Sequence, residues 1–190
     1  IFGEAGFWLT PSMPMDILWE TKRLKERGEL NPETLRRIVL EYFREDNGTA
    51  LKGMLDEWRD DPKFAPRMHI FEDALEAHLA GKYTLSVPAL LPHIEGIASC
   101  IVDIKPGHPK KIMDSVEEII LEDNWILRRV TANVVSEEIK KSYRYLNFDN
   151  FDEELKKEGR TEAQFLHRHA ILHGVQINYD SEENSLKAFL

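Results

Sequence analysis

Cysteine is almost absent from this sequence of 190 residues, which contains only Cys100. One thiol cannot form a disulfide within the chain, so a disulfide-stabilised scaffold is excluded. Cys100 lies in the apolar run IASCIV, and we predict that its thiol is buried. Long apolar runs are also missing, since no segment approaches the roughly 18 uninterrupted apolar residues of a membrane helix. We therefore expect no membrane partner.

Basic residues are outnumbered: 25 Lys and Arg stand against 34 Asp and Glu, which gives a net charge of -9. Such a surface repels polyanions, which argues against broad electrostatic binding to DNA, RNA or anionic membranes but is compatible with a local basic pocket. The sequence lacks the GxxxxGK[ST] phosphate loop, so it gives no support to a nucleoside triphosphatase.

The start of the sequence shows no recognisable signal peptide. The start, IFGEAGFWLTPSMP, lacks the basic and long apolar regions of a signal peptide, and we expect a soluble, cytoplasmic protein. The first residue is Ile1, and the sequence stops at SLKAFL inside an apolar pattern. We therefore expect a fragment of a longer protein, truncated at the C-terminus.

Strand signals are weak, because no hairpin dipeptide lies between alternating apolar residues. Helix signals are frequent: Asn31-Pro32-Glu33 is typical of a helix start, Gly28 of a helix end, and Ser86 and Ser181 of N-caps. Apolar residues at helical spacing predict helices near 32–43, 51–58, 70–79, 86–101, within 110–146 (two), near 151–158, at 161–173 and after 181. The sequence therefore predicts an all-α fold.

The stretch DDPKFAPR, residues 60–67, combines two prolines with a charge cluster and is the best candidate for a domain boundary. We predict an N-terminal helical subdomain over 1–62 and a helical bundle over 63–190. The four tryptophans show no regular spacing that would suit base stacking. We interpret them as packing residues: Trp8, Trp19, Trp58 and Trp125.

Three histidines and an arginine lie within seven residues of the segment FLHRHAILHG, residues 165–174. His169 and His173 are four apart and share one face of a helix, so one interpretation is a metal site with His167 or an acid as third ligand. The string lacks the Glu of an H-E-x-x-H helix, and the cationic Arg168 is a poor neighbour for a divalent ion.

A second interpretation of the cluster is cleavage of RNA without a metal. The attacking 2′-hydroxyl must lose a proton and the leaving 5′-oxygen must gain one, and an imidazole with a pKa near about 6.5 suits either task. A guanidinium stabilises the negative charge that gathers on the phosphoryl oxygens. One arginine and one or two histidines are a sufficient set, and RNA is the expected partner because its 2′-hydroxyl is the nucleophile.

The string Arg168 to His173, RHAILH, resembles the R-x4-6-H motif of the HEPN superfamily (higher eukaryotes and prokaryotes nucleotide-binding domains). The polar His169 after the arginine fits the family pattern. The segments LSVPALLPHIEGI, RHAILHG and YDSEENSLKAFL also resemble a group of bacterial proteins of unassigned activity. The resemblance spans about residues 66–190. It departs from some toxin members, which carry Tyr two residues beyond the histidine, where this chain has Val175; Tyr179 is not assigned that role.

The resemblance implies an all-α bundle of about four or five helices with the motif at or just before the start of a late helix. It further implies a metal-independent ribonuclease of a toxin–antitoxin or phage-defence system, without a cofactor, that forms a homodimer with two motifs in one cleft. A protein partner such as an antitoxin is part of that expectation.

The expected roles follow from the chemistry of each residue. Arg168 stabilises phosphoryl charge, His173 is the general acid or base, and His169 assists by polar contacts or proton transfer. Glu95, an acid in the apolar stretch HIEGIASCIV, is costly to bury unless paired, and we predict that it orients Arg168. Asn184 on the last helix is a second candidate supporting residue.

Three alternatives stay open at this point. The domain is an inactive HEPN-like module that binds a partner or a nucleotide, or the histidines bind a structural metal, or the cluster is only a polar helix end. In the last case His169 and His173 face water near a helix C-terminus closed by Gly174, and Ile171 and Leu172 face the core. For Glu95, the corresponding alternative is a position on the polar face of its helix.

Overall fold

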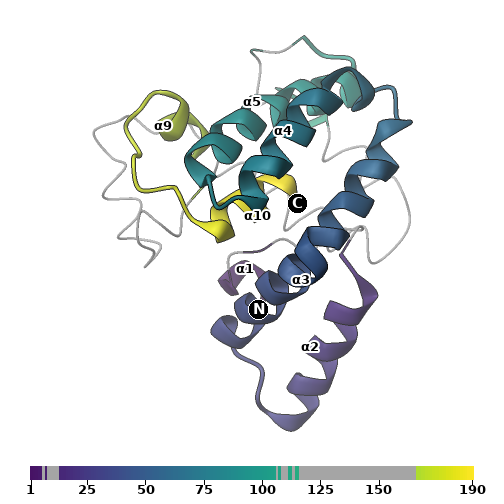
Figure 1. Cartoon of the computed structure of the whole chain (residues 1–190), viewed down its shortest axis with the longest axis vertical. Helices are drawn as coiled ribbons and strands as arrows, with labels where there is room; N and C mark the ends of the chain where they lie inside the picture. Colours follow the sequence, from purple (N-terminus) through teal and green to yellow (C-terminus); the bar gives the residue numbers. More distant parts are fainter. Residues whose placement is uncertain (6, 8–12, 106, 108–110, 113, 116–165) are drawn as a thin grey trace.

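The computed structural model describes residues 1–5, 7, 13–105, 107, 111–112, 114–115 and 166–190. Its helices are α1 (Phe2–Ala5), α2 (Met15–Arg27), α3 (Pro32–Arg59), the 3-10 helix η1 (Ala65–Arg67), α4 (Met68–Leu79), α5 (Tyr83–Val102), α9 (Arg168–Leu172) and α10 (Glu182–Phe189) (Figure 1). Helices make up 75% of the described residues, which contain no strand. The predicted all-α fold class is therefore confirmed for this part of the chain.

Helix ends follow the local signals of the sequence at several places. The Asn31 side chain accepts a hydrogen bond of 2.9 Å from the backbone N–H of Thr34, and Pro32 is the first residue of α3. Gly28 ends α2 in the left-handed conformation, with φ of 71°. Ser181 caps α10 by accepting a hydrogen bond from the N–H of Asn184. Each of these caps was predicted, because the groups that satisfy a helix end lie within a few residues of it.

The two helices predicted over 32–43 and 51–58 correspond to the two halves of α3. Between them, Asp46, Asn47 and Gly48 take left-handed backbone conformations with φ of 48°, 54° and 73°, so the helix is kinked. Gly48 is buried in the kink, and a methyl group at its position would lie 2.5 Å from Cδ2 of Leu79 at the end of α4. Glycine is therefore required here for both conformation and space.

The start predicted for α5 was wrong. The helix begins at Tyr83, and Ser86 lies inside it, fully buried. Its hydroxyl lies 2.6 Å from Oγ of Ser185 on α10 and donates a longer hydrogen bond of 3.5 Å to the carbonyl of Tyr83, so it does not cap the helix. Pro88 and Pro92 are also inside the helix. Their spacing of four places both rings on one side of α5, where the side chains are partly or largely exposed and water can reach carbonyl groups that a proline leaves unpaired.

Although α5 lacks an uninterrupted apolar run of membrane-spanning length, its length and composition would allow it to cross a membrane, with a mean hydropathy of 1.5 over 18 residues. Core helices of soluble proteins often have the same property, and one such helix is weak evidence for a membrane protein. In this structure α5 packs against α4, α9 and α10.

The core lies where α3, α4, α5 and α10 meet, and α9 lies beyond α5, away from α3 (Figure 1). The most deeply buried apolar side chains of the core include Phe7, Leu35, Leu51, Val87 and Leu186. One cluster of buried residues contains side chains from both sides of the boundary predicted after residue 62. The division into 1–62 and 63–190 stays a prediction.

Several predicted features have a different environment or lie outside the described residues. Cys100 was expected to be buried but is exposed, because Ser99 takes the core-facing position of α5. Trp19 was expected to be a packing residue but is 59% exposed on α2, whereas Trp58 stacks on Phe64 as predicted. Outside the described residues lie Trp8, Trp125, the predicted helix at 151–158, most of the region predicted to form two helices over 110–146, and residues 161–165 of the predicted helix at 161–173.

Candidate functional site

The turn before α9 is organised by His167, which is 1% exposed. Its backbone is extended, and its ring Nδ1 accepts a hydrogen bond of 3.0 Å from the N–H of Ala170, which makes it the N-cap of α9. The N–H of His167 donates to Oε1 of Gln176, which is fully buried. The helix predicted over 161–173 was therefore wrong at residues 166 and 167, which are not helical. A short helix begins at Arg168 instead, because the side chain of His167 caps it.

Arg168 is the first residue of α9, and its guanidinium is held by α5. Nη2 lies 3.1 Å from Oε2 of Glu95, and Nε donates a hydrogen bond of 3.1 Å to the carbonyl oxygen of Leu91. The other carboxylate oxygen of Glu95 accepts from the N–H of Gly107 at 2.8 Å. The predicted pairing of Glu95 with Arg168 is confirmed, and the two side chains are only 10% and 20% exposed, so solvent screens the ion pair weakly.

His169 and His173 lie side by side, with ring centroids 4.2 Å apart and the planes tilted by 53°. This is the arrangement expected for residues four apart on one helical turn. His169 is partly buried, and burial lowers its pKa, with further lowering by the charges of His173 and Arg168. His169 therefore favours the neutral imidazole, which can accept a proton, while His173 is exposed to solvent.

The end of α9 also has the form expected for a polar helix terminus. Gly174 is left-handed with φ of 72°, and the N–H of Val175 donates to the carbonyl of Ala170 at 2.8 Å. Ile171 is buried, as that interpretation predicted. Leu172 was expected to face the core but is 40% exposed, because so short a helix turns only one narrow side toward α5.

Asn184 is fully buried in the first turn of α10 and donates a hydrogen bond of 3.1 Å to the carbonyl of Tyr179. This contact stabilises the turn that precedes α10. A supporting role of Asn184 at Arg168 stays a prediction.

A buried polar cluster that sequence reasoning missed joins three helices. Oγ of Ser185 on α10 lies 2.8 Å from Nδ1 of His78 on α4 and 2.6 Å from Oγ of Ser86 on α5. Burial lowers the pKa of His78, and the charge of Glu182 opposes this effect. Both serines are 0% exposed, so this Ser–His pair connects helices rather than facing a substrate. No sequence motif marks it, because Ser185 is 107 positions from His78 and 99 positions from Ser86.

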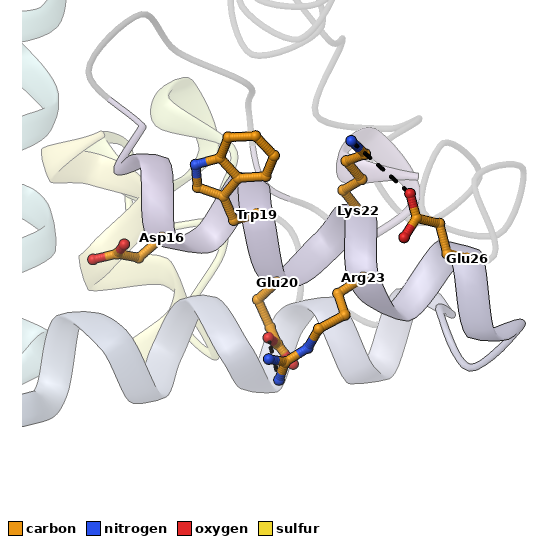
Figure 2. A pocket seen from close by; sticks show the side chains of 6 residues that line it. All are labelled: Asp16, Trp19, Glu20, Lys22, Arg23 and Glu26. Atoms are coloured by element: carbon orange, nitrogen blue, oxygen red, sulfur yellow. Dashed lines mark ion pairs between the residues drawn. The ribbon is translucent and has the colours of Figure 1, made fainter.

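A separate surface pocket of about 460 Å³ lies along α2. Figure 2 shows the side chains that line it: Asp16, Trp19, Glu20, Lys22, Arg23 and Glu26. Lys22 lies over the ring of Trp19 at 5.3 Å, and two ion pairs, between residues 22 and 26 and residues 20 and 23, neutralise charges within the same helix. All of these side chains come from α2, and none of them comes from α9.

Comparison with protein-family models, with curated proteins and with solved structures finds no match to this chain. Within the residues that the structure describes, no three His, Cys, Asp or Glu side chains are grouped so that they could hold a metal ion. The interpretation of the site therefore depends on its own geometry: a fixed guanidinium at the start of a short helix, followed by two adjacent imidazoles.

Proposed function

We propose that this chain is a HEPN-like, metal-independent endoribonuclease. The observation that supports this most directly is the position of Arg168, which begins a late helix of an all-α fold and is oriented by Glu95. His173 follows Arg168 after four intervening residues, as the R-x4-6-H motif requires, and its ring lies beside that of His169.

In the proposed reaction, the neutral imidazole of His169 takes the proton of an RNA 2′-hydroxyl. The 2′-oxygen forms a bond to the adjacent phosphorus, and the bond from phosphorus to the 5′-oxygen breaks. The protonated imidazole of His173 gives its proton to that leaving oxygen, while Arg168 stabilises the charge on the phosphoryl oxygens. The products are a 2′,3′-cyclic phosphate and a 5′-hydroxyl.

We also propose that the protein acts as a homodimer with α9 at or near the interface, so that two copies of the motif line one cleft. Its place in a toxin–antitoxin or phage-defence system, with an antitoxin as protein partner, belongs to the same proposal. Light scattering at micromolar concentration tests the dimer, and a monomer at that and higher concentrations would contradict it.

The test of the enzyme is cleavage of a range of RNAs by purified protein with and without EDTA. We expect activity that survives EDTA, products with a cyclic phosphate, and no cleavage of DNA of the same sequence. Arg168→Lys should reduce the rate, since a point charge does not reproduce the guanidinium fork. Activity that is unchanged by His173→Ala would belong to a contaminant and would remove the proposal.

A second candidate function is an interaction or nucleotide-binding module without catalysis. It is favoured by the environment of Arg168, which is only 20% exposed and already engaged by Glu95 and the Leu91 carbonyl. For such a module, we expect partner or nucleotide binding that is sensitive to Arg168 but no cleavage by the wild-type chain. Binding without cleavage over the same RNAs would favour this candidate.

A further inference from the structure

A second fixed guanidinium lies on a different side of α5. Arg67, the last residue of η1, donates from Nη1 to the carbonyl of Lys63 at 2.7 Å and from Nη2 to the carbonyl of Gly96 at 3.4 Å. A methyl group at Gly96 would lie 3.3 Å from Nη2, so the missing side chain at this position allows the close approach. The guanidinium is therefore held in place by backbone groups.

The partners of Arg67 differ from those of six other arginines in the described part of the chain. Each of the following has a carboxylate oxygen within 4.0 Å: Arg23, Arg36, Arg37, Arg44, Arg59 and Arg168. The contacts of Arg67 are instead two carbonyls and, at 3.8 Å, the thiol of Cys100. In a protein with a net charge of -9, this leaves a fixed positive charge that no described carboxylate within 4.0 Å neutralises.

Two histidines lie close to Arg67 along the chain or on the helix that it contacts. His93 is three residues before Gly96, so it shares the side of α5 that the guanidinium approaches, and His69 follows Arg67 by two residues. His93 of α5 packs edge-on against Phe71, with ring centroids 5.8 Å apart and planes at 89°, which fixes the imidazole. Burial lowers the pKa of His93, and the charges of Arg67 and His69 lower it further. Three groups that can be cationic are thus gathered at one place, and a bound anion would relieve their mutual repulsion.

The two arginines approach α5 from different sides. Arg168 contacts Leu91 and Glu95, whereas Arg67 contacts Gly96 and Cys100. Because an α-helix turns by about 100° per residue, Gly96 and Cys100 lie on a different side of α5 from Leu91 and Glu95. The cluster at Arg67 is therefore separate from the candidate site at α9.

We propose that Arg67, His69 and His93 form a binding site for a phosphate monoester group. A guanidinium fork and two imidazoles supply the donors that a doubly charged phosphate accepts. A small anion is favoured over a long polyanion because the chain as a whole is acidic. This site does not depend on the proposed nuclease function.

The first test is a titration of the histidine ring signals of the wild-type chain by NMR, with and without inorganic phosphate or a nucleoside 5′-monophosphate. Binding of a dianion beside His93 should raise the pKa of this residue. By linkage, protonation of His93 should increase the affinity for phosphate by the same factor by which bound phosphate increases the proton affinity of His93. A pKa of His93 that does not change with saturating phosphate overturns the proposal.

Variants give the second test. Arg67→Ala should lower the phosphate affinity by about tenfold or more, which is typical for loss of a charge-assisted hydrogen bond. Arg59→Ala is the matched control, since it removes the same charge from a neighbouring residue paired with Glu72, and should change the affinity by less than about twofold. Equal losses in both variants would show a general charge effect and overturn the site.

His93→Gln leaves the hydrogen bonds of Arg67 to Lys63 and Gly96 in place, so it tests the site if Arg67→Ala fails to fold, and it should weaken phosphate binding severalfold. The source of the phosphate is tested with two short RNAs of one sequence, one with a 5′-phosphate and one with a 5′-hydroxyl. We expect only the first to shift the His93 signal. Equal shifts with both RNAs would show recognition of the nucleic-acid backbone and contradict the assignment to a monoester.

Discussion

The kink of α3 offers a comparison between two glycines that share a backbone conformation but differ in surroundings. Gly28 and Gly48 have φ of 71° and 73°. A methyl group at Gly28 would meet nothing within 4 Å, whereas at Gly48 it would collide with Cδ2 of Leu79. Substitution by alanine at both positions therefore separates the cost of the conformation from the cost of the packing.

For Gly28→Ala we expect a loss of about 1 kcal/mol in the free energy of unfolding, which is the cost of a side chain in the left-handed region. Gly48→Ala carries the same cost and adds overpacking of about 1–2 kcal/mol, since the obstructing atom is the end of a flexible side chain that can move in part. The total for Gly48→Ala is about 2–3 kcal/mol. At about 2–4 °C per kcal/mol, the two variants should differ in Tm by several degrees.

The assay is urea unfolding followed by circular dichroism, which is suited to a helical protein. Gly81→Ala is a further control, because Gly81 has φ of 70° and open space around its Cβ position. If Gly48→Ala is no less stable than the two controls, then α3 does not approach Leu79 as described and the reasoning fails. If all three alanine variants lose the same, larger amount of unfolding free energy, the destabilisation comes from the backbone conformation alone and not from the contact with Leu79.

Three further predictions concern the sites. His173→Ala should lower RNA cleavage by roughly 10²–10⁴-fold, the usual effect of losing a general acid or base, as measured in single-turnover assays. Glu95→Gln should reduce the unfolding free energy by roughly 2–4 kcal/mol, because it removes the carboxylate charge that pairs with the largely buried guanidinium of Arg168. Glu41→Gln, in an exposed ion pair, should cost less than about 1 kcal/mol. Equal losses in the two variants would refute the importance of burial. Because the pKa of His78 is lowered in the folded state, the unfolded chain binds more protons at this residue. The contribution of neutral His78 to stability should be complete above a pH of about 6.5 and should decrease below it, by up to about 1.4 kcal/mol per pH unit. His78→Gln should remove this slope from the pH dependence of urea midpoints.

The features that were predictable from the sequence depend either on residues that are neighbours in the chain or on the free-energy cost of burying an unpaired charge. The cap at Asn31 and the end at Gly28 are local, and both are confirmed. The partner of Glu95 was predictable because an acid among apolar residues needs a cation, and Arg168 was the available candidate. In these cases one residue type has few ways to satisfy its chemistry.

The features that were missed depend on tertiary contacts. Ser86 carries the signal of an N-cap, but its hydroxyl meets Ser185 instead, and nothing near residue 86 indicates this. Trp19 was predicted to be a packing residue and Cys100 a buried thiol, yet the rotation of their helices turns both toward solvent. The role of His167 as a cap was hidden because histidine is an unusual residue for that position.

The attachment of α10 has a consequence for how the chain reaches this structure. Its N-terminal acids pair with α3, where Arg44 and Glu182 are 138 positions apart, and Ser185 meets His78 across 107 positions. Contacts between such distant residues form only after a long loop has closed, and proteins rich in them fold slowly. During synthesis, α3, α4 and α5 are made well before α10, so the apolar surface that Leu186 and Phe189 later cover stays open in the growing chain. We expect this surface to be the one that chaperones engage and the one through which incomplete chains aggregate.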